Sequence, residues 1–337
     1  MLLTTFTTLS CAALMGLAIQ RGGTCFVHAV YEILTEGHMR RLRAILEASL
    51  WVTGGLALGH VTGVAGITLA STPISVWSVV GGVLLGVGAS INRACALGTV
   101  AQLGTGNWAY AMTPLGYYLG CLSASLLFPR VDLPIKVSGL ALPASAPWLV
   151  TAFLLYMLWR VGAPLQTALR QGSPTRVLLG ELWSPHVATV TIGASFVVLL
   201  LVGGHWSYTD VLADFANAAH GQPVQADLPV GLLLMLFAGA VIGGLTSGKW
   251  NLTAPALGPA ARCLIGGTVM AWGSGLIPGS NDRLLLIGIP LLQANAWIAM
   301  AAMALTVTAA ISIQSGMQRR AGKLRETPGH GKLRDSH

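Results

Sequence analysis

The sequence predicts an all-α, polytopic integral membrane protein, and three observations support this fold class. Hydrophobic residues make up 54% of the 337 residues and charged residues only 9%, whereas soluble domains carry about 25% charged residues. The mean hydropathy is +0.69. Apolar runs of about 18 residues or more, long enough for a helix to cross the hydrocarbon core of a bilayer, recur along the whole chain. We therefore expect a lipid bilayer to surround most of the chain.

Apolar runs predict about nine membrane-spanning helices, in order near residues 3–20, 44–69, 76–91, 108–128, 146–160, 186–204, 230–247, 263–277 and 294–314. The first has no Lys or Arg ahead of its apolar run, so we expect a membrane helix there and not a cleaved signal peptide. Three shorter apolar pieces, at 23–35, 94–103 and 284–292, are too brief to cross a core of ~30 Å. We expect them to be short re-entrant half-helices, which a membrane tolerates only where protein covers them or where they line a cavity.

Charged residues set the predicted orientation of these helices. The positive-inside rule places the basic segments in the cytoplasm; they are Arg40–Arg43, the loop with Arg160, Arg170 and Arg176, Lys249 with Arg262, and the tail 316–337. The loop 203–229 carries Asp210, Asp214 and Asp227 without Lys or Arg, and we expect it on the outer side. We expect the basic tail to be disordered. The net charge of +8 is dispersed among loops, so it does not indicate nucleic acid binding.

An internal repeat divides the chain into two halves. Gly81-Gly82-x5-Gly88 recurs as Gly266-Gly267-x5-Gly273 at an offset of 185 residues, which also aligns Cys95 with Ser280. Duplicated halves with interrupted apolar segments are typical of repeat-built transporters, whose substrate site lies where the halves meet. The sequence therefore predicts one transmembrane transporter domain, 1–315. Its inverted-repeat halves, about 1–130 and 186–315, are joined by a span near 146–160 and a basic cytoplasmic loop.

The segment Gln20-Arg21-Gly22-Gly23-Thr24-Cys25 is the first candidate functional site. It lies between a predicted membrane span and a short apolar piece, so we expect Cys25 near a helix N-terminus, where unpaired N–H groups favour anions. A thiol in that field, with Arg21 nearby, has increased thiolate character. The alternative interpretation is structural, with Cys25 as a small buried hydrophobe and Arg21 as a flanking residue that reaches the interface.

The segment Asn92-Arg93-Ala94-Cys95 repeats the combination of a cation, nearby glycines and one thiol. An arginine at membrane depth costs a few kcal/mol, so it usually faces a cavity or a partner. Two such segments in one chain favour the wall of a solute pathway over simple packing.

The third candidate is Gly279-Ser280-Asn281-Asp282-Arg283, where Pro278 and Gly279 break a helix and a new apolar piece begins after Asp282, the predicted N-cap. The alternative is a purely structural turn.

The other candidate residues predict no cofactor and no enzyme site. The five cysteines form neither a disulfide framework nor a C-x-x-C zinc pattern. We expect Cys11 and Cys121 to lie in the core, and leave open whether Cys263, beside Arg262, is functional. A further group with metal-binding side chains lacks a recognised ligand spacing, and we interpret it as part of a solvated outer loop; its members are His205, Asp210, Asp214 and His220. We therefore expect no metal.

Taken together, these motifs resemble the YeeE/YedE family of bacterial inner-membrane sulfur transporters. The resemblance rests on Gln20-Arg21-Gly22-x-x-Cys25, on Gly81-Gly82-x5-Gly88-x6-Cys95-x-x-Gly98-Thr99 and on Pro278-Gly279-Ser280-Asn281, and it extends to about residue 315. It implies an hourglass of inverted-repeat halves with pathway cysteines at the waist, thiosulfate as substrate and a TusA-like cytoplasmic sulfur carrier as partner. It also implies a multi-pass protein of the bacterial inner (cytoplasmic) membrane with a cytoplasmic C-terminal tail.

The resemblance carries over Cys25 and Cys95 as pathway thiols, but Ser280 stands where the family has a third cysteine. We therefore expect uptake of thiosulfate or a related small sulfur anion. The expected pathway residues are Gln20, Arg21, Cys25, Asn92, Arg93, Cys95, Gly279, Ser280 and Asn281. The alternatives are transport of a selenium compound, or a membrane sulfurtransferase or redox protein that uses Cys25 and Cys95.

Overall fold

The computed structural model of the protein describes residues 2–62, 68–71, 73–128, 136–139, 147–170, 183–223, 227–277 and 279–325. Within these ranges, five helical stretches are long and apolar enough to cross a membrane; they are Leu2–Glu36, Val76–Gly104, Pro185–Gly203, Asp227–Thr246 and Ala294–Met317. A bent pair, Leu257–Leu276 with Asn281–Gly288, makes a sixth if it is one span. The chain is a multi-pass membrane protein.

The predicted number of about nine spans is not confirmed. Helices do form near three further predicted spans, 44–69, 108–128 and 146–160, but none of them is among the five. α3 (Arg40–Val61) begins with three arginines in its first four residues and also contains Glu47, which lowers its hydropathy. α6 (Met112–Leu127) has only 16 residues, fewer than the roughly 20 that a spanning helix needs.

The predicted short apolar pieces all form short helices, each directly after a longer one. α1 (Leu2–Gly22) is followed by α2 (Phe26–Glu36), and α4 (Val76–Asn92) by α5 (Ala96–Gly104). α12 (Leu257–Leu276) is followed, after a bend of 56°, by α13 (Asn281–Arg283) and one turn of π-helix, η2 (Leu284–Gly288). A fourth break separates α9 (Pro185–Gly203) from α10 (Tyr208–Ala219), which the sequence analysis assigned to a loop.

The remaining elements complete two similar series of helices. The first half ends with η1 (Trp108–Ala111) and α6, and the second half contains α11 (Asp227–Thr246) and ends with α14 (Ala294–Arg325). α7 (Pro147–Arg170) and an antiparallel ribbon of β1 (Thr68–Ser71) and β2 (Lys136–Gly139), which was not predicted, lie between them in sequence. In chain order α1, α2, α3, α4 and α6 correspond to α9, α10, α11, α12 and α14.

Packing contacts follow the same correspondence. α1 packs against α11, and its counterpart α9 packs against α3. α4 packs against α14, and its counterpart α12 packs against α6. α2 contacts α14 as α10 contacts α6, and the equivalent helices α4 and α12 pack against each other. Each of these contacts therefore recurs in the other half with the partners exchanged.

Glycines allow α4 and α12 to cross backbone to backbone. A Cβ atom built on Gly81 or Gly273 would lie 2.6 Å from the carbonyl oxygen of the other residue, and one on Gly88 would lie 2.7 Å from that of Gly266. Real Cβ atoms do not approach so closely, so only glycine fits. The repeat aligns Gly81 with Gly266 and Gly88 with Gly273, so exchanging the two halves converts the Gly81–Gly273 contact into the Gly266–Gly88 contact.

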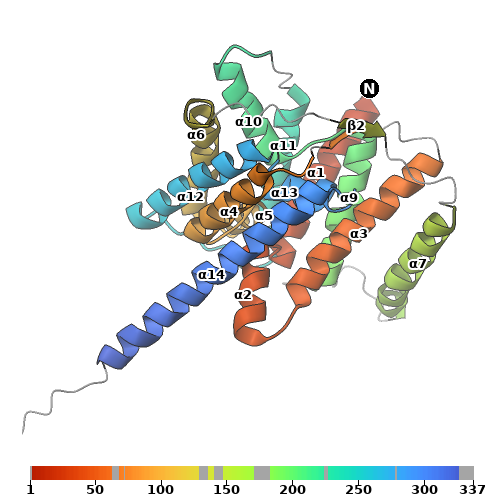
Figure 1. Ribbon diagram of the computed structural model, residues 1–337. Helices are drawn as coiled ribbons and strands as arrows, with labels where there is room; N and C mark the ends of the chain where they lie inside the picture. The colour runs from red at the N-terminus through yellow and green to blue at the C-terminus, as the bar shows by residue number, and fades with distance from the viewer. Residues whose placement is uncertain are drawn as a thin grey trace, which may run out of the picture.

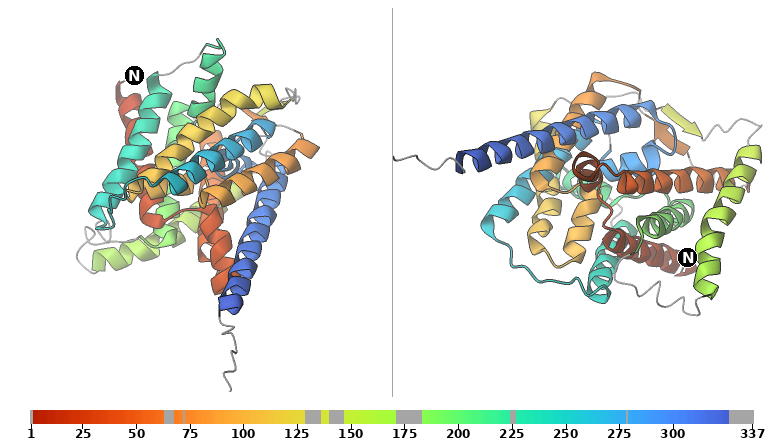
Figure 2. Two further views of the ribbon diagram at one scale, coloured as in Figure 1. Left: turned by 90° about the vertical axis from the view of Figure 1, so that its left-hand side faces the viewer. Right: turned by 90° about the horizontal axis from the view of Figure 1, so that it is seen from below.

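The two ends of the molecule differ in charge and in the elements that form them. The N-terminus of α1 and α10 lie at one end, whereas α2 and the C-terminal end of α14 lie at the other (Figures 1 and 2). α14 continues to Arg325, into the segment that was expected to be disordered, and residues 326–337 lie outside the described ranges. Its last turns are rich in Arg and Lys, which favour helix and suit the negative end of the helix dipole.

We expect Gly273→Ala to destabilise the protein by about 1–3 kcal/mol, because the new methyl group is forced against the Gly81 carbonyl. Gly275→Ala, two residues away on the same helix, is the matched control. Its methyl group would lie 3.9 Å from the Ala124 side chain, so stability is unchanged or slightly raised. Thermal unfolding of both variants in detergent checks this; equal melting temperatures would contradict the close crossing.

Candidate functional site

Cys25, Cys95 and Ser280 share one structural position. Each is the residue immediately before a short helix, α2, α5 or α13 respectively. Their relative exposures are 2%, 0% and 1%. Local sequence explains the breaks at the first two, since Gly23 and Arg93 adopt positive φ angles of 56° and 62° that end the preceding helices.

The structure brings the first two of these residues into direct contact. The Cys25 and Cys95 side chains interact, and the Phe26 backbone N–H, directly after Cys25, donates to Cys95 Sγ at 3.3 Å. Both cysteines are free. Gly98 leaves the space that Cys25 occupies, because a Cβ atom on Gly98 would lie 2.5 Å from Cys25 Sγ. The result is a pair of buried thiols beside the N-terminal ends of α2 and α5.

The third break joins this pair through backbone groups. The Ala96 N–H, directly after Cys95, donates to Asn281 Oδ1 at 3.2 Å. The Ala96 carbonyl accepts a hydrogen bond of 3.0 Å from the Tyr208 hydroxyl on α10. Asn281 is buried, and its amide Nδ2 has no hydrogen-bond partner among the residues that the structure describes. The breaks before α5, α10 and α13 therefore meet at one place.

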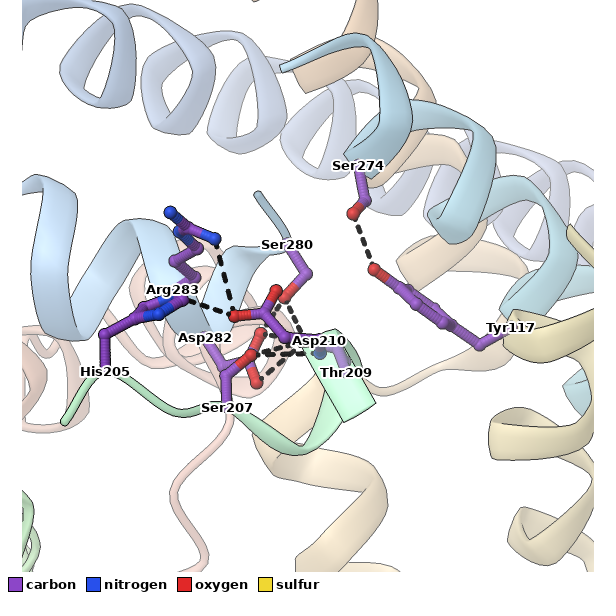
Figure 3. Close-up of polar contacts among 9 residues, drawn as sticks. All are labelled: Tyr117, His205, Ser207, Thr209, Asp210, Ser274, Ser280, Asp282 and Arg283. Carbon is purple, nitrogen blue, oxygen red and sulfur yellow. Dashed lines mark hydrogen bonds and ion pairs between the residues drawn. The ribbon is translucent and has the colours of Figure 1, made fainter. Parts of the chain in front are cut away.

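Ser280 belongs to a cluster of hydroxyl and carboxylate groups (Figure 3). Its hydroxyl lies 2.6 Å from Thr209 Oγ1 and donates to Asp282. Thr209 also donates to both carboxylate oxygens of Asp282, at 3.0 and 3.1 Å, and lies 3.0 Å from Ser207 Oγ. These four side chains, Ser207, Thr209, Ser280 and Asp282, are all buried, and we call them the hydroxyl–carboxylate cluster.

Asp210 lies at the outer edge of this cluster, outside the candidate spans. His205 Nε2 approaches its carboxylate at 3.2 Å and the Arg283 guanidinium at 3.5 Å. Burial by itself raises the pKa of the Asp210 carboxyl, but the hydrogen bond from His205 and the charge of Arg283 outweigh it and hold that pKa below its ordinary value. The interpretation of Asp210 as part of a solvated loop is thus corrected, because α10 folds back against the break at Ser280.

The sequence did not single out Ser207 or Thr209 as members of a site. Asp282, in the third candidate segment, was expected to be an N-cap, whereas Ser280 is the residue that precedes α13. One signal was present: Ser207-x-x-Asp210 has the spacing of a helix N-terminal capping box, and Ser207 does accept from the Asp210 N–H at 3.2 Å. That motif predicts a helix start in the supposed loop, at a position equivalent to Cys25.

The other predicted pathway residues lie around the breaks in different roles. Asn92 donates to the Ala94 carbonyl at 2.9 Å and to Thr99 Oγ1 at 3.2 Å, and accepts from Thr113 at 2.9 Å. It thereby holds the α4–α5 break together. Gly279 is buried beside the Arg283 side chain.

The predicted cations separate in the structure. Arg21 is buried and donates to Thr246 on α11 at 2.8 Å, next to the buried Gln20. Arg93 is exposed at the C-terminal end of α4, so its side chain does not join the buried groups. Among the described residues, no group of three or more His, Cys, Asp or Glu side chains is arranged to hold a metal ion.

We expect Asn92→Leu to lower stability by about 1–3 kcal/mol for each buried group that it leaves unpaired. The affected groups are the Thr113 hydroxyl and the Ala94 carbonyl, since the Thr99 hydroxyl still donates to the Cys95 carbonyl at 3.1 Å. Thermal unfolding in detergent measures the loss. Normal stability together with a loss of solute uptake would instead make Asn92 a solute ligand.

Comparison with known proteins adds two findings to this geometry. A family model described as sulphur transport matches residues 21–309, which include Cys25, Cys95 and Ser280. The thiosulfate transporter TsuA of Escherichia coli (strain K12) is 24% identical over 345 residues. That match covers 93% of this chain and 96% of the relative.

Proposed function

Because the chain belongs to the sulphur transport family, the YeeE/YedE transporters that its motifs resemble, we propose that it takes up thiosulfate or a related small sulfur anion through the buried site at Cys25, Cys95 and Ser280. The protein is a transporter and not an enzyme. The observation that carries the proposal is the pair of free, buried thiols in contact at two helix breaks. The similar protein TsuA of Escherichia coli is a thiosulfate transporter, which supports the same class of substrate. The alternatives of a selenium compound and of a sulfurtransferase or redox protein are not confirmed.

The chemistry of the site suits a thiosulfate dianion. Its three oxygens need hydrogen-bond donors or positive potential to offset dehydration, and the N-terminal ends of α2 and α5 supply both. Its terminal sulfur is soft and polarisable, as are the Cys25 and Cys95 thiols. Contacts between S–H groups and sulfur are weak, so they permit both binding and release. Sulfate lacks the terminal sulfur, and this difference gives the site a basis for selectivity.

The packing supports inverted-repeat halves with this site between them. Contacts that recur with exchanged partners, the glycine contacts included, are what a two-fold axis produces. The same relation makes Ser207 and Ser280 the counterparts of Cys25 and Cys95. One half thus contributes thiols and the other contributes hydroxyls. A repeat-built transporter binds its substrate where the halves meet.

We propose that the protein lies in the bacterial inner membrane, that its C-terminal tail is cytoplasmic, and that it delivers sulfur to a TusA-like carrier. The start of α3, with Arg40, Arg41 and Arg43, and the basic end of α14 lie at the same end of the molecule (Figures 1 and 2), where they would attract an acidic partner. Arg160 is not available for such docking because it pairs with Glu47 at 2.6 Å, and Arg176 lies outside the described ranges. Co-purification of a TusA-like protein with the full chain, and its loss when Arg40, Arg41 and Arg43 become Ala, tests this proposal.

We expect Cys25→Ala and Cys95→Ala each to reduce uptake of labelled thiosulfate at least about tenfold, roughly the value of one lost hydrogen-bond donor. Cys121→Ala is the control, since Cys121 lies half-buried within α6 and does not precede a short helix. Uptake is measured in cells and divided by the amount of protein in the membrane. Undiminished uptake by the double variant would show that the thiols are structural.

We expect Ser280→Cys to increase thiosulfate uptake if the pathway works best with a third thiol, because sulfur is softer than a hydroxyl oxygen. If Ser280 instead suits a different anion, the same change weakens uptake of that anion and leaves thiosulfate little affected. Parallel uptake of thiosulfate, sulfite and selenium oxyanions by wild type, Ser280→Cys and Ser280→Ala separates these results. Wild-type behaviour of both variants for every anion would remove Ser280 from the pathway.

A further inference from the structure

Asp282 is a buried carboxyl group beside the proposed pathway, and the transport of an anion gives it no obvious role. Only 2% of its surface is exposed. It follows Asn281, whose side-chain oxygen binds the Ala96 N–H directly after Cys95. Among the ion pairs of the described residues none involves Asp282, because the neighbouring Arg283 pairs with Asp210. An ionised carboxylate at this place would repel a dianion in a medium of low dielectric constant.

A row of polar side chains leads from Asp282 to the partly exposed His205 (Figure 3). It begins at His205, whose side chain is 38% exposed, and which contacts Asp210. The Ser207 hydroxyl accepts a hydrogen bond from the Asp210 backbone N–H at 3.2 Å and lies 3.0 Å from Thr209 Oγ1, and Thr209 donates to Asp282. Hydroxyl groups donate and accept at the same time, so Ser207 and Thr209 can pass a proton between the two carboxylates by reorienting.

The surroundings of Asp282 favour a proton over a larger ion. Its two oxygens are already bonded by Ser280 and Thr209. The adjacent cavity, lined by Ser207, Asp282 and Arg283 among others, has a volume of about 10 Å³, room for about one water molecule. The titratable and charged groups that face Asp282 are Asp210 and Tyr208 on α10, Tyr117 on α6, Arg283 on its own helix and, beyond Tyr208, Cys95.

We propose that Asp282 binds the proton that accompanies the anion, so that the protein is a proton–anion symporter. This inference rests on the proposed function. A proton from the outer side passes along His205, Asp210, Ser207 and Thr209 and adds to the Asp282 carboxylate, which becomes a neutral acid. The anion then occupies the waist without repulsion. When the anion leaves to the inside, the carboxylic acid releases its proton to the same side, and the ionised carboxylate returns for the next cycle.

The test uses the purified full-length protein in liposomes, labelled thiosulfate, and a pH-sensitive dye inside. With the membrane potential clamped at zero, one proton per anion predicts about tenfold accumulation for each unit of pH gradient, acid outside. Added thiosulfate should also acidify the interior. Thiosulfate counterflow, the exchange of labelled for unlabelled anion without any gradient, measures transport apart from coupling.

Two variants interrupt the coupling at different points. Asp282→Asn should retain measurable counterflow but lose both accumulation and acidification. Thr209→Val keeps the size of the side chain and removes the hydroxyl link, so it should slow acidification at least about tenfold. This variant tests the proposal by itself if Asp282→Asn does not fold. Asp214→Asn, an exposed carboxyl on the same helix as Thr209, is the matched control and should behave as wild type.

Each of the other possible results would contradict one specific claim. Counterflow by wild type without any response to the pH gradient would overturn the proton coupling and leave the proposed function intact. Accumulation driven by a sodium gradient at equal pH would make the coupling ion sodium. Coupling that survives in Asp282→Asn would overturn the role of Asp282. Absence of thiosulfate counterflow in wild type would overturn the proposed function, and the inference with it.

Discussion

A helix that breaks inside a membrane leaves backbone N–H and C=O groups without helical partners, and lipid offers none in exchange. The protein meets this constraint by bringing its helix breaks together. The Phe26 N–H finds the Cys95 sulfur, the Ala96 N–H finds Asn281, and the Ala96 carbonyl finds Tyr208. Because these partners come from different breaks, the backbone groups at one break depend on another break for their hydrogen bonds. The positions of Cys25, Cys95 and Ser280 depend on this mutual arrangement.

Close helix packing makes this arrangement possible. A Cβ atom on Gly239 would lie 1.8 Å from the Ala13 carbonyl, and one on Gly16 equally close to that of Leu236, so α1 and α11 touch through their backbones. The α4–α12 crossing uses glycine in the same way. In a bilayer the hydrophobic effect does not drive helices together, and small residues that permit close contact take its place. The glycines thus let the long helices pack closely, and the candidate site residues lie at the breaks between these helices and the short ones.

The two halves supply different chemistry on a similar framework. The first half places two thiols, Cys25 and Cys95, before its short helices, and the second places Ser207 and Ser280 at the corresponding positions. Thiols are weak donors that suit soft sulfur, whereas hydroxyls beside a carboxylate suit protons and hard oxygens. The proposed anion pathway would therefore have thiols on one side and hydroxyl and carboxylate groups on the other.

The sequence by itself determined the features that depend on local composition and spacing. Apolar runs and few charges established a helical membrane protein, and the shortness of 23–35, 94–103 and 284–292 predicted the short helices. Constant spacing of glycines revealed the repeat, and the motifs around Cys25 and Cys95 identified the family. Span lengths can be read from local sequence because the bilayer thickness and the helical rise fix how many residues a spanning helix needs, whichever helices it packs against.

Only the tertiary structure decided which side chains meet. Arg93 and Arg21 have similar sequence surroundings, yet Arg93 is exposed and Arg21 is buried against α11. Thr209 and Asp282 are 73 residues apart in segments that were read as a loop and a turn, yet they share a buried hydrogen bond. Spacing along a helix says which residues share a face, but not which face meets which neighbour. That choice depends on how the helix crossings and breaks of both halves pack at once.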